Sequence, residues 1–135
     1  MNKPLNILLA CASFRGYTGS EIYFYELATA LRSAGHGVWI WSDNTGTPLT
    51  NKVRDIEFNI SNIKYDLVIV SQGKHVWNSI RKVNAKKIIN IVHSEVLPPI
   101  EDPIIDPKID SYVGIRPSIV KYIKQKVTDK EVKLI

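Results

Sequence analysis

The chain has 135 residues, a length that suits one domain burying roughly two-thirds of its unfolded surface. Its 44% hydrophobic and 23% charged residues argue against disorder, and the single Cys11 excludes an internal disulfide and is expected to be a buried thiol. The net charge of +5 arises entirely in residues 71–135, which carry twelve basic and seven acidic side chains against six and six in residues 1–70.

The first predicted elements are a buried strand and an amphipathic helix. Leu5–Ala10 is a continuous apolar run, which predicts a strand covered on both faces. Ser20 is the predicted N-cap of the helix, Glu21 suits its first turn, and Gly35 is expected to end it. The predicted buried face consists of Phe24, Leu27, Ala28, Leu31 and Ala34.

The middle of the chain alternates between apolar runs and helical or polar stretches. The predicted elements are a strand at Gly37–Ser42, a polar loop over Asp43–Lys52, a short strand at Ile56–Ile60, a buried strand at Tyr65–Ser71, a helix over about Val76–Val83, and a strand at Lys86–Val92.

The last third begins with a loop and returns to the same alternation. His93–Pro107 contains four prolines, Asp110–Ile115 is a predicted strand, and Pro117 suits the first turn of a helix running to about Val127. The run Val132–Ile135 fits either an excised domain or a natural edge strand. Together the elements predict an α/β fold, a single domain with a doubly wound, mostly parallel Rossmann-like sheet of about six to seven strands.

The excess positive charge gathers at two places. Lys82, Lys86 and Lys87 flank one predicted strand, and the late helix carries a second set, which comprises Arg116, Lys121, Lys124 and Lys126. A solvated helix face is the simple interpretation. The alternative is an anionic partner, either a phosphate-rich acceptor or a lipid surface. Nucleic acid is not expected, because aromatic residues are not interleaved with these lysines.

The segment "CASFRGYTGSE" follows the first strand and directly precedes a helix N-terminus, where backbone N–H groups and the helix dipole favour an anion. Gly16 and Gly19 have no side chains, so a ligand could approach the backbone of this segment closely. The spacing matches neither the dinucleotide Gly-x-Gly-x-x-Gly pattern, since Phe14 is not glycine, nor a phosphate-binding lysine loop. A turn without a ligand fits this pattern equally well.

Several catalytic signatures are absent from the sequence. No Asp-x-Asp element is present, which argues against a divalent-metal nucleotide-sugar site. The three histidines lie far apart and lack ligand neighbours at helical spacing, so no metal is expected. No Gly-x-Ser-x-Gly element supports a hydrolase nucleophile.

His93 stands out because it directly follows a predicted strand, at the sheet edge where α/β folds bind ligands. It could hydrogen-bond a hydroxyl or phosphate, or tie down the proline-rich loop. His75 also follows a strand end, so a ligand role is open for it, whereas His36 lies in a turn at the opposite edge and is expected to be structural.

The tryptophans are expected to pack rather than to bind. Trp39 and Trp41 alternate within one predicted strand, which is typical of packing residues. Trp77 is interpreted as a core or interface residue in preference to a sugar-stacking platform.

The order of these sequence features along the chain resembles the order found in a known family. The "GSE" loop, "LATALRSAGHGV", "YDLVIV", "IVHSE" and "DSYVGIRPSIVKYI" are similar, across essentially the whole chain, to the N-terminal domain of family-4 retaining glycosyltransferases of the GT-B architecture. The sequence departs from that family at Ser20, where many members have a second glycine, and at Arg116, which stands in place of a serine.

The resemblance implies an acceptor-side domain whose glycine loop faces the diphosphate of a UDP- or GDP-linked sugar, without any other cofactor. The implied diphosphate loop comprises Gly16, Gly19, Ser20 and Glu21. His93 is the implied contact to the sugar or acceptor near the reaction centre. The implied acceptor cleft comprises Arg15, Ser71, Gln72, Gly73, His75 and Glu95.

The family's second domain supplies most donor contacts through a Glu-x7-Glu element, which no part of this sequence contains. The chain alone is therefore expected to be inactive, with a sugar or lipid-linked acceptor and a separate donor-binding domain as partners.

The expected location is the cytoplasm, because no apolar run approaches the ~20 residues of a membrane span. The alternative location is peripheral, at the inner face of the membrane. The alternatives are a stand-alone Rossmann-like module that binds a nucleotide or a protein, and a small self-sufficient enzyme.

Overall fold

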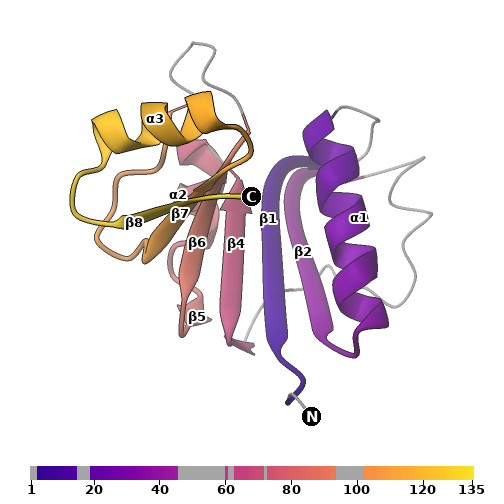
Figure 1. Cartoon of the computed structure of the whole chain (residues 1–135). Helices are drawn as coiled ribbons and strands as arrows, with labels where there is room; N and C mark the ends of the chain where they lie inside the picture. Colours follow the sequence, from indigo (N-terminus) through magenta and orange to yellow (C-terminus); the bar gives the residue numbers. More distant parts are fainter. Residues whose placement is uncertain (1–2, 15–18, 46–59, 61–62, 72, 94–101) are drawn as a thin grey trace.

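The computed structural model describes residues 3–14, 19–45, 60, 63–71, 73–93 and 102–135, of which residues 12–14, 19–21 and 43–45 are described by backbone alone. These residues form a six-stranded sheet, a two-stranded sheet and three helices (Figure 1). The elements are β1 (Asn6–Phe14), α1 (Gly19–Ser33), β2 (Gly37–Thr45), β3 (Lys64–Tyr65), β4 (Leu67–Ser71), α2 (Lys74–Ile80), β5 (Asn84–Ala85), β6 (Ile88–Val92), β7 (Ser111–Gly114), α3 (Pro117–Lys126) and β8 (Glu131–Leu134).

The main sheet has the strand order β2-β1-β4-β6-β7-β8, and all of its neighbouring strands are parallel. The chain moves outward in one direction from β1 to β2 and in the other direction from β4 to β8. Strand order therefore reverses between β1 and β4, the type of position where doubly wound sheets bind ligands. The predicted α/β, Rossmann-like single domain is confirmed.

The two faces of the sheet carry separate cores. On one face α1 buries Phe24 and Ala28 against β1 and β2, together with the buried thiol of Cys11. On the other face α2 and α3 contribute Trp77 and Ile119, among other apolar residues. The predictions of a buried Cys11 and a core Trp77 are thus confirmed. Ala34, expected on the buried face of the helix, lies beyond α1 and is exposed.

Three predicted boundaries on the first face were wrong. β1 and β2 each run past the predicted ends at Ala10 and Ser42, because their parallel pairing continues to Phe14 opposite Thr45. This backbone ladder overrides the turn preference of the Asp43-Asn44 pair, which lies within β2. Helix α1 begins at Gly19, so Ser20 lies in its first turn rather than at the N-cap.

Later boundaries shift for local reasons. Gly73 adopts a φ of 126°, a left-handed value that suits glycine, and α2 starts directly after it, two residues earlier than expected. Most of the predicted strand Ile56–Ile60 lies outside the described residues. The predicted helix start at Pro117 is confirmed.

Two aspartates that were predicted to lie within strands stand at the amino edge of the sheet, directly before β4 and β7. The Asp66 carboxylate accepts the Asn6 backbone N–H at 2.8 Å, and the Asp110 carboxylate accepts the Ile88 N–H at 2.7 Å. The Asp66 carboxylate thereby holds the start of β1, and the Asp110 carboxylate holds the start of β6. The backbone hydrogen bond from Asn6 lowers the pKa of Asp66, with a further contribution from the Lys86 ammonium, 3.2 Å away.

The turn after α1 has the structural role expected of it. Gly35 adopts a φ of 95°, which favours glycine, and α1 ends two residues before it. The His36 Nδ1 atom accepts a hydrogen bond from the Leu5 backbone N–H at 3.0 Å. His36 therefore ties this turn to the start of β1, at the edge opposite His93.

Gly114 marks a close approach between β7 and α3. A Cβ atom at this position would lie 3.0 Å from both the backbone nitrogen and the Cγ2 atom of Val120. We expect Gly114→Ala to lower the free energy of unfolding by about 1–3 kcal/mol, because the helix must move away from the strand. Urea unfolding measures this loss. The exposed α3 substitution Gln125→Ala is the control, and equal stability of both variants would contradict the prediction.

Candidate functional site

The candidate site lies at the carboxyl edge of β4 and β6, on the face that α1 covers. Ser71 ends β4 and pairs with Ile91, and His93 lies two residues farther along the same chain. Because side chains alternate along a strand, Ile91 and His93 share one face. Ile91 belongs to the core under α1, and Ser71 is buried. Ser71 and His93 are therefore brought to the same edge next to the reversal of strand order.

The His93 imidazole packs against the N-terminal half of α1. Its ring centroid lies 5.1 Å from that of Tyr23 in a T-shaped contact and 5.8 Å from that of Phe24. Phe24 is fully buried, so it holds the imidazole from the core side. Tyr23 lies one helical turn after Gly19, where α1 begins. His93 thus lies beside the first turns of the helix that follows the glycine-containing segment.

Burial determines the chemistry of this imidazole. The Nε2 atom is buried, and desolvation lowers the pKa of His93 from 6.5 to about 4. The ring is therefore neutral near pH 7, with one nitrogen able to donate a hydrogen bond and the other able to accept one. A base with this pKa takes up protons poorly at neutral pH, so the imidazole is poorly suited to proton abstraction. Burial also raises the pKa of Tyr23, which keeps its hydroxyl neutral.

Asn90 connects the strands that lead into the site. This fully buried side chain donates to the Val70 carbonyl at 2.9 Å and accepts the Ile104 backbone N–H at 2.9 Å. It therefore joins the end of β4 to the segment that returns toward β7. Tyr112 reinforces the same segment by donating its hydroxyl to the Ile104 carbonyl. The Tyr122 hydroxyl donates to the Asp102 carboxylate, so α3 holds that segment as well.

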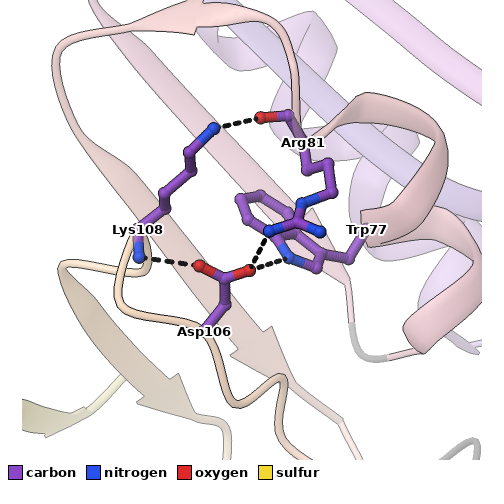
Figure 2. Close-up of polar contacts among 4 residues, drawn as sticks. All are labelled: Trp77, Arg81, Asp106 and Lys108. Atoms are coloured by element: carbon purple, nitrogen blue, oxygen red, sulfur yellow. Dashed lines mark hydrogen bonds and ion pairs between the residues drawn. The ribbon is translucent and has the colours of Figure 1, made fainter.

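A second anchor surrounds Asp106 (Figure 2). Its carboxylate accepts the Lys108 backbone N–H and the Trp77 indole N–H, each at 2.9 Å, and pairs with the Arg81 guanidinium at 3.0 Å. Lys108 in turn donates its ammonium to the Arg81 carbonyl at 3.0 Å. The Lys108 backbone hydrogen bond, followed by the one from Trp77, lowers the pKa of Asp106. This cluster fixes the returning segment against the end of α2.

The structure places the other predicted site residues as follows. Gly19 begins α1, and Ser20 and Glu21 lie in its first turn. Gly73 precedes α2, and His75 lies exposed in the first turn of that helix, which packs on the opposite face of the sheet from α1. The remaining predicted site residues, Arg15, Gly16, Gln72 and Glu95, lie outside the described residues.

Sequence reasoning missed two residues of this region. Tyr23 is not among the predicted site residues, although its place four residues after Gly19 puts it one turn into the helix. Asn90 is predicted only as part of an apolar strand, although a lone amide inside "IINIV" is a signal for a buried hydrogen-bonding role.

Of the two predicted basic sets, Lys82, Lys86 and Lys87 are exposed around β5, and most of the other set lies on α3. Lys121 and Lys124 are exposed there and line a hollow of about 440 Å³ together with Pro117 and Val120.

Within the described part of the chain, no group of His, Cys, Asp and Glu side chains could hold a metal ion. No helix among the described residues is long and apolar enough to cross a membrane.

The chain matches no protein-family model, no curated protein and no solved structure. Function is therefore argued from the fold and from the chain's own side chains.

Proposed function

We propose that the chain is the acceptor-side domain of a retaining glycosyltransferase that uses a UDP- or GDP-linked sugar. The observation that carries this proposal is the neutral His93 imidazole, packed on Tyr23 beside the first turns of α1. This pairing lies at the carboxyl edge of a doubly wound sheet, next to the reversal of strand order, where ligands bind in such folds. The resemblance described above supports the same assignment.

In this proposal different residues bind the donor diphosphate, a hydroxyl of the sugar or acceptor, and the charged part of the acceptor. The N-terminus of α1 supplies backbone N–H groups and a positive dipole end for the donor diphosphate. His93 hydrogen-bonds a hydroxyl of the sugar or acceptor, because a neutral imidazole both donates and accepts. The exposed Lys121 and Lys124 of α3 suit an anionic or lipid-linked acceptor. A separate donor-binding domain completes the reaction centre, so the chain alone is expected to bind weakly and to transfer no sugar.

The proposal can be tested by NMR titration of the ¹⁵N- and ¹³C-labelled chain with UDP-glucose and, separately, with GDP-mannose. We expect millimolar binding, detectable at about 10 mM ligand. The His93 ring and the Gly19 and Tyr23 amides should shift, whereas the His36 ring at the opposite edge should not. His93→Gln should weaken binding, and Asn78→Ala is the control, because Asn78 is exposed on α2, which packs on the other face of the sheet.

Two results would count against this function. Shifts confined to regions away from α1 and His93, or none with either nucleotide sugar, would remove its support. Micromolar binding of UDP or GDP by the isolated chain, without any contribution from the sugar, would instead favour the stand-alone nucleotide-binding module.

A further inference from the structure

Among the described residues, strand β8 has no neighbouring strand on its outer side, so its outer edge presents backbone hydrogen-bonding groups. It is the outermost strand of the main sheet in the described part of the chain, and β7 is its neighbour on the inner side (Figure 1). The Ile135 N–H donates inward to the Gly114 carbonyl at 3.1 Å. Because backbone groups alternate in direction along a strand, the N–H and C=O groups of Val132 and Leu134 point to the outer edge.

The charges along this edge are self-complementary. Glu131 and Lys133 flank Val132 and lie on one face of the strand, where their side chains are 59% and 68% exposed. The Lys133 Nζ atom lies 3.5 Å from the Glu131 Oε1 atom. An antiparallel copy centred on Val132 places Glu131 of each chain opposite Lys133 of the other. The two Val132 residues then exchange both backbone hydrogen bonds. We propose that β8 pairs in this way with β8 of a second copy, which joins two six-stranded sheets into one.

Other pairings of the same edge are less favourable. A parallel, in-register pair would place Glu131 opposite Glu131 and Lys133 opposite Lys133, and like charges directly opposite destabilise a sheet. An antiparallel pair centred on Lys133 brings the two lysines face to face. Charged edge residues commonly block pairing between strands. Here the pairing centred on Val132 is the antiparallel arrangement that places each Glu131 opposite Lys133 of the other copy.

Apolar surface beside the edge supports the same arrangement. Leu134 is 53% exposed, and the Val132-centred register places it opposite Lys130 of the other copy. Lys130 borders a hollow of about 200 Å³, which is also lined by Val127 and by Ile105, itself 69% exposed. Leu134 and Val132 share a face of the strand, and Val132 packs on the core under α3. The leucine of each copy therefore comes to the rim of this hollow on the other, which Asp106 and Asp129 also line.

Sedimentation velocity on the 135-residue chain, from about 10 to 500 μM, tests this proposal through charge reversal. We expect the wild type to show a concentration-dependent monomer–dimer equilibrium. Glu131→Lys and Lys133→Glu should each weaken dimerisation on the order of tenfold, because both symmetry-related contacts become repulsive. The double variant should dimerise like the wild type, and an equimolar mixture of the two single variants should form heterodimers.

Circular dichroism establishes that the variants fold, which is expected because both side chains are exposed. A monomeric wild type at the highest concentration would overturn the proposal. So would single variants that dimerise like the wild type, or a mixture that stays monomeric. None of these outcomes depends on His93 or on sugar binding.

Discussion

Replacement of Asn90 by alanine is expected to lower the free energy of unfolding by about 3 kcal/mol, a large share of a domain's stability. The substitution removes both side-chain hydrogen bonds and leaves the Ile104 N–H buried without the Asn90 oxygen that it now contacts at 2.9 Å. An unsatisfied buried donor costs about 1–3 kcal/mol, and the cavity left by a fully buried side chain adds to that loss.

Thermal and urea unfolding of the variant measure this effect. Asn78→Ala is the matched control, because Asn78 is exposed on α2. Asn90→Leu separates the two causes, since leucine fills the space without forming hydrogen bonds. If Asn90→Leu were as stable as the wild type, packing rather than hydrogen bonding would account for the role of Asn90.

Periodicity was sufficient to predict the fold class. The apolar run within β1 and the spacing of Phe24 and Ala28 on α1 each report directly on burial, which the structure confirms. Element ends were predicted less well, because they depend on partners distant in sequence. The pairing of β1 with β2 extends both strands to Phe14 and Thr45, and no local signal in "SDNT" indicates that pairing.

In the candidate site, too, the position along the chain was predictable, whereas contacts between distant residues were not. A histidine directly after a buried strand must lie near the carboxyl edge, so the place of His93 in the sheet followed from chain order. Its contact with Tyr23 depends on how α1 is rotated over the sheet, which the sequence pattern does not specify. The two bonds of Asn90 likewise require the returning segment at Ile104 to pass over β6.

We further expect the protein to lose stability on acidification through His93. Its pKa in the folded state, about 4, lies below its ordinary value of 6.5, so the unfolded chain takes up the proton first. The contribution of His93 is therefore fully present above about pH 6.5 and is lost as the pH falls toward 4. Two-state linkage gives a loss of about 2 kcal/mol between pH 8 and pH 5.

Urea unfolding at pH 8 and at pH 5, followed by the fluorescence of the three tryptophans, measures this loss. Carboxylates also titrate over part of this range, so the informative quantity is the difference between the wild type and His93→Gln, which cannot be protonated. The wild type should lose about 2 kcal/mol more than this variant. Equal losses in the wild type and His93→Gln would mean that the imidazole is protonated as easily in the folded protein as in the unfolded chain. The packing of His93 on Tyr23 and Phe24 would then be too loose to keep the ring neutral, and the hydroxyl-binding role proposed for it would lose its physical basis.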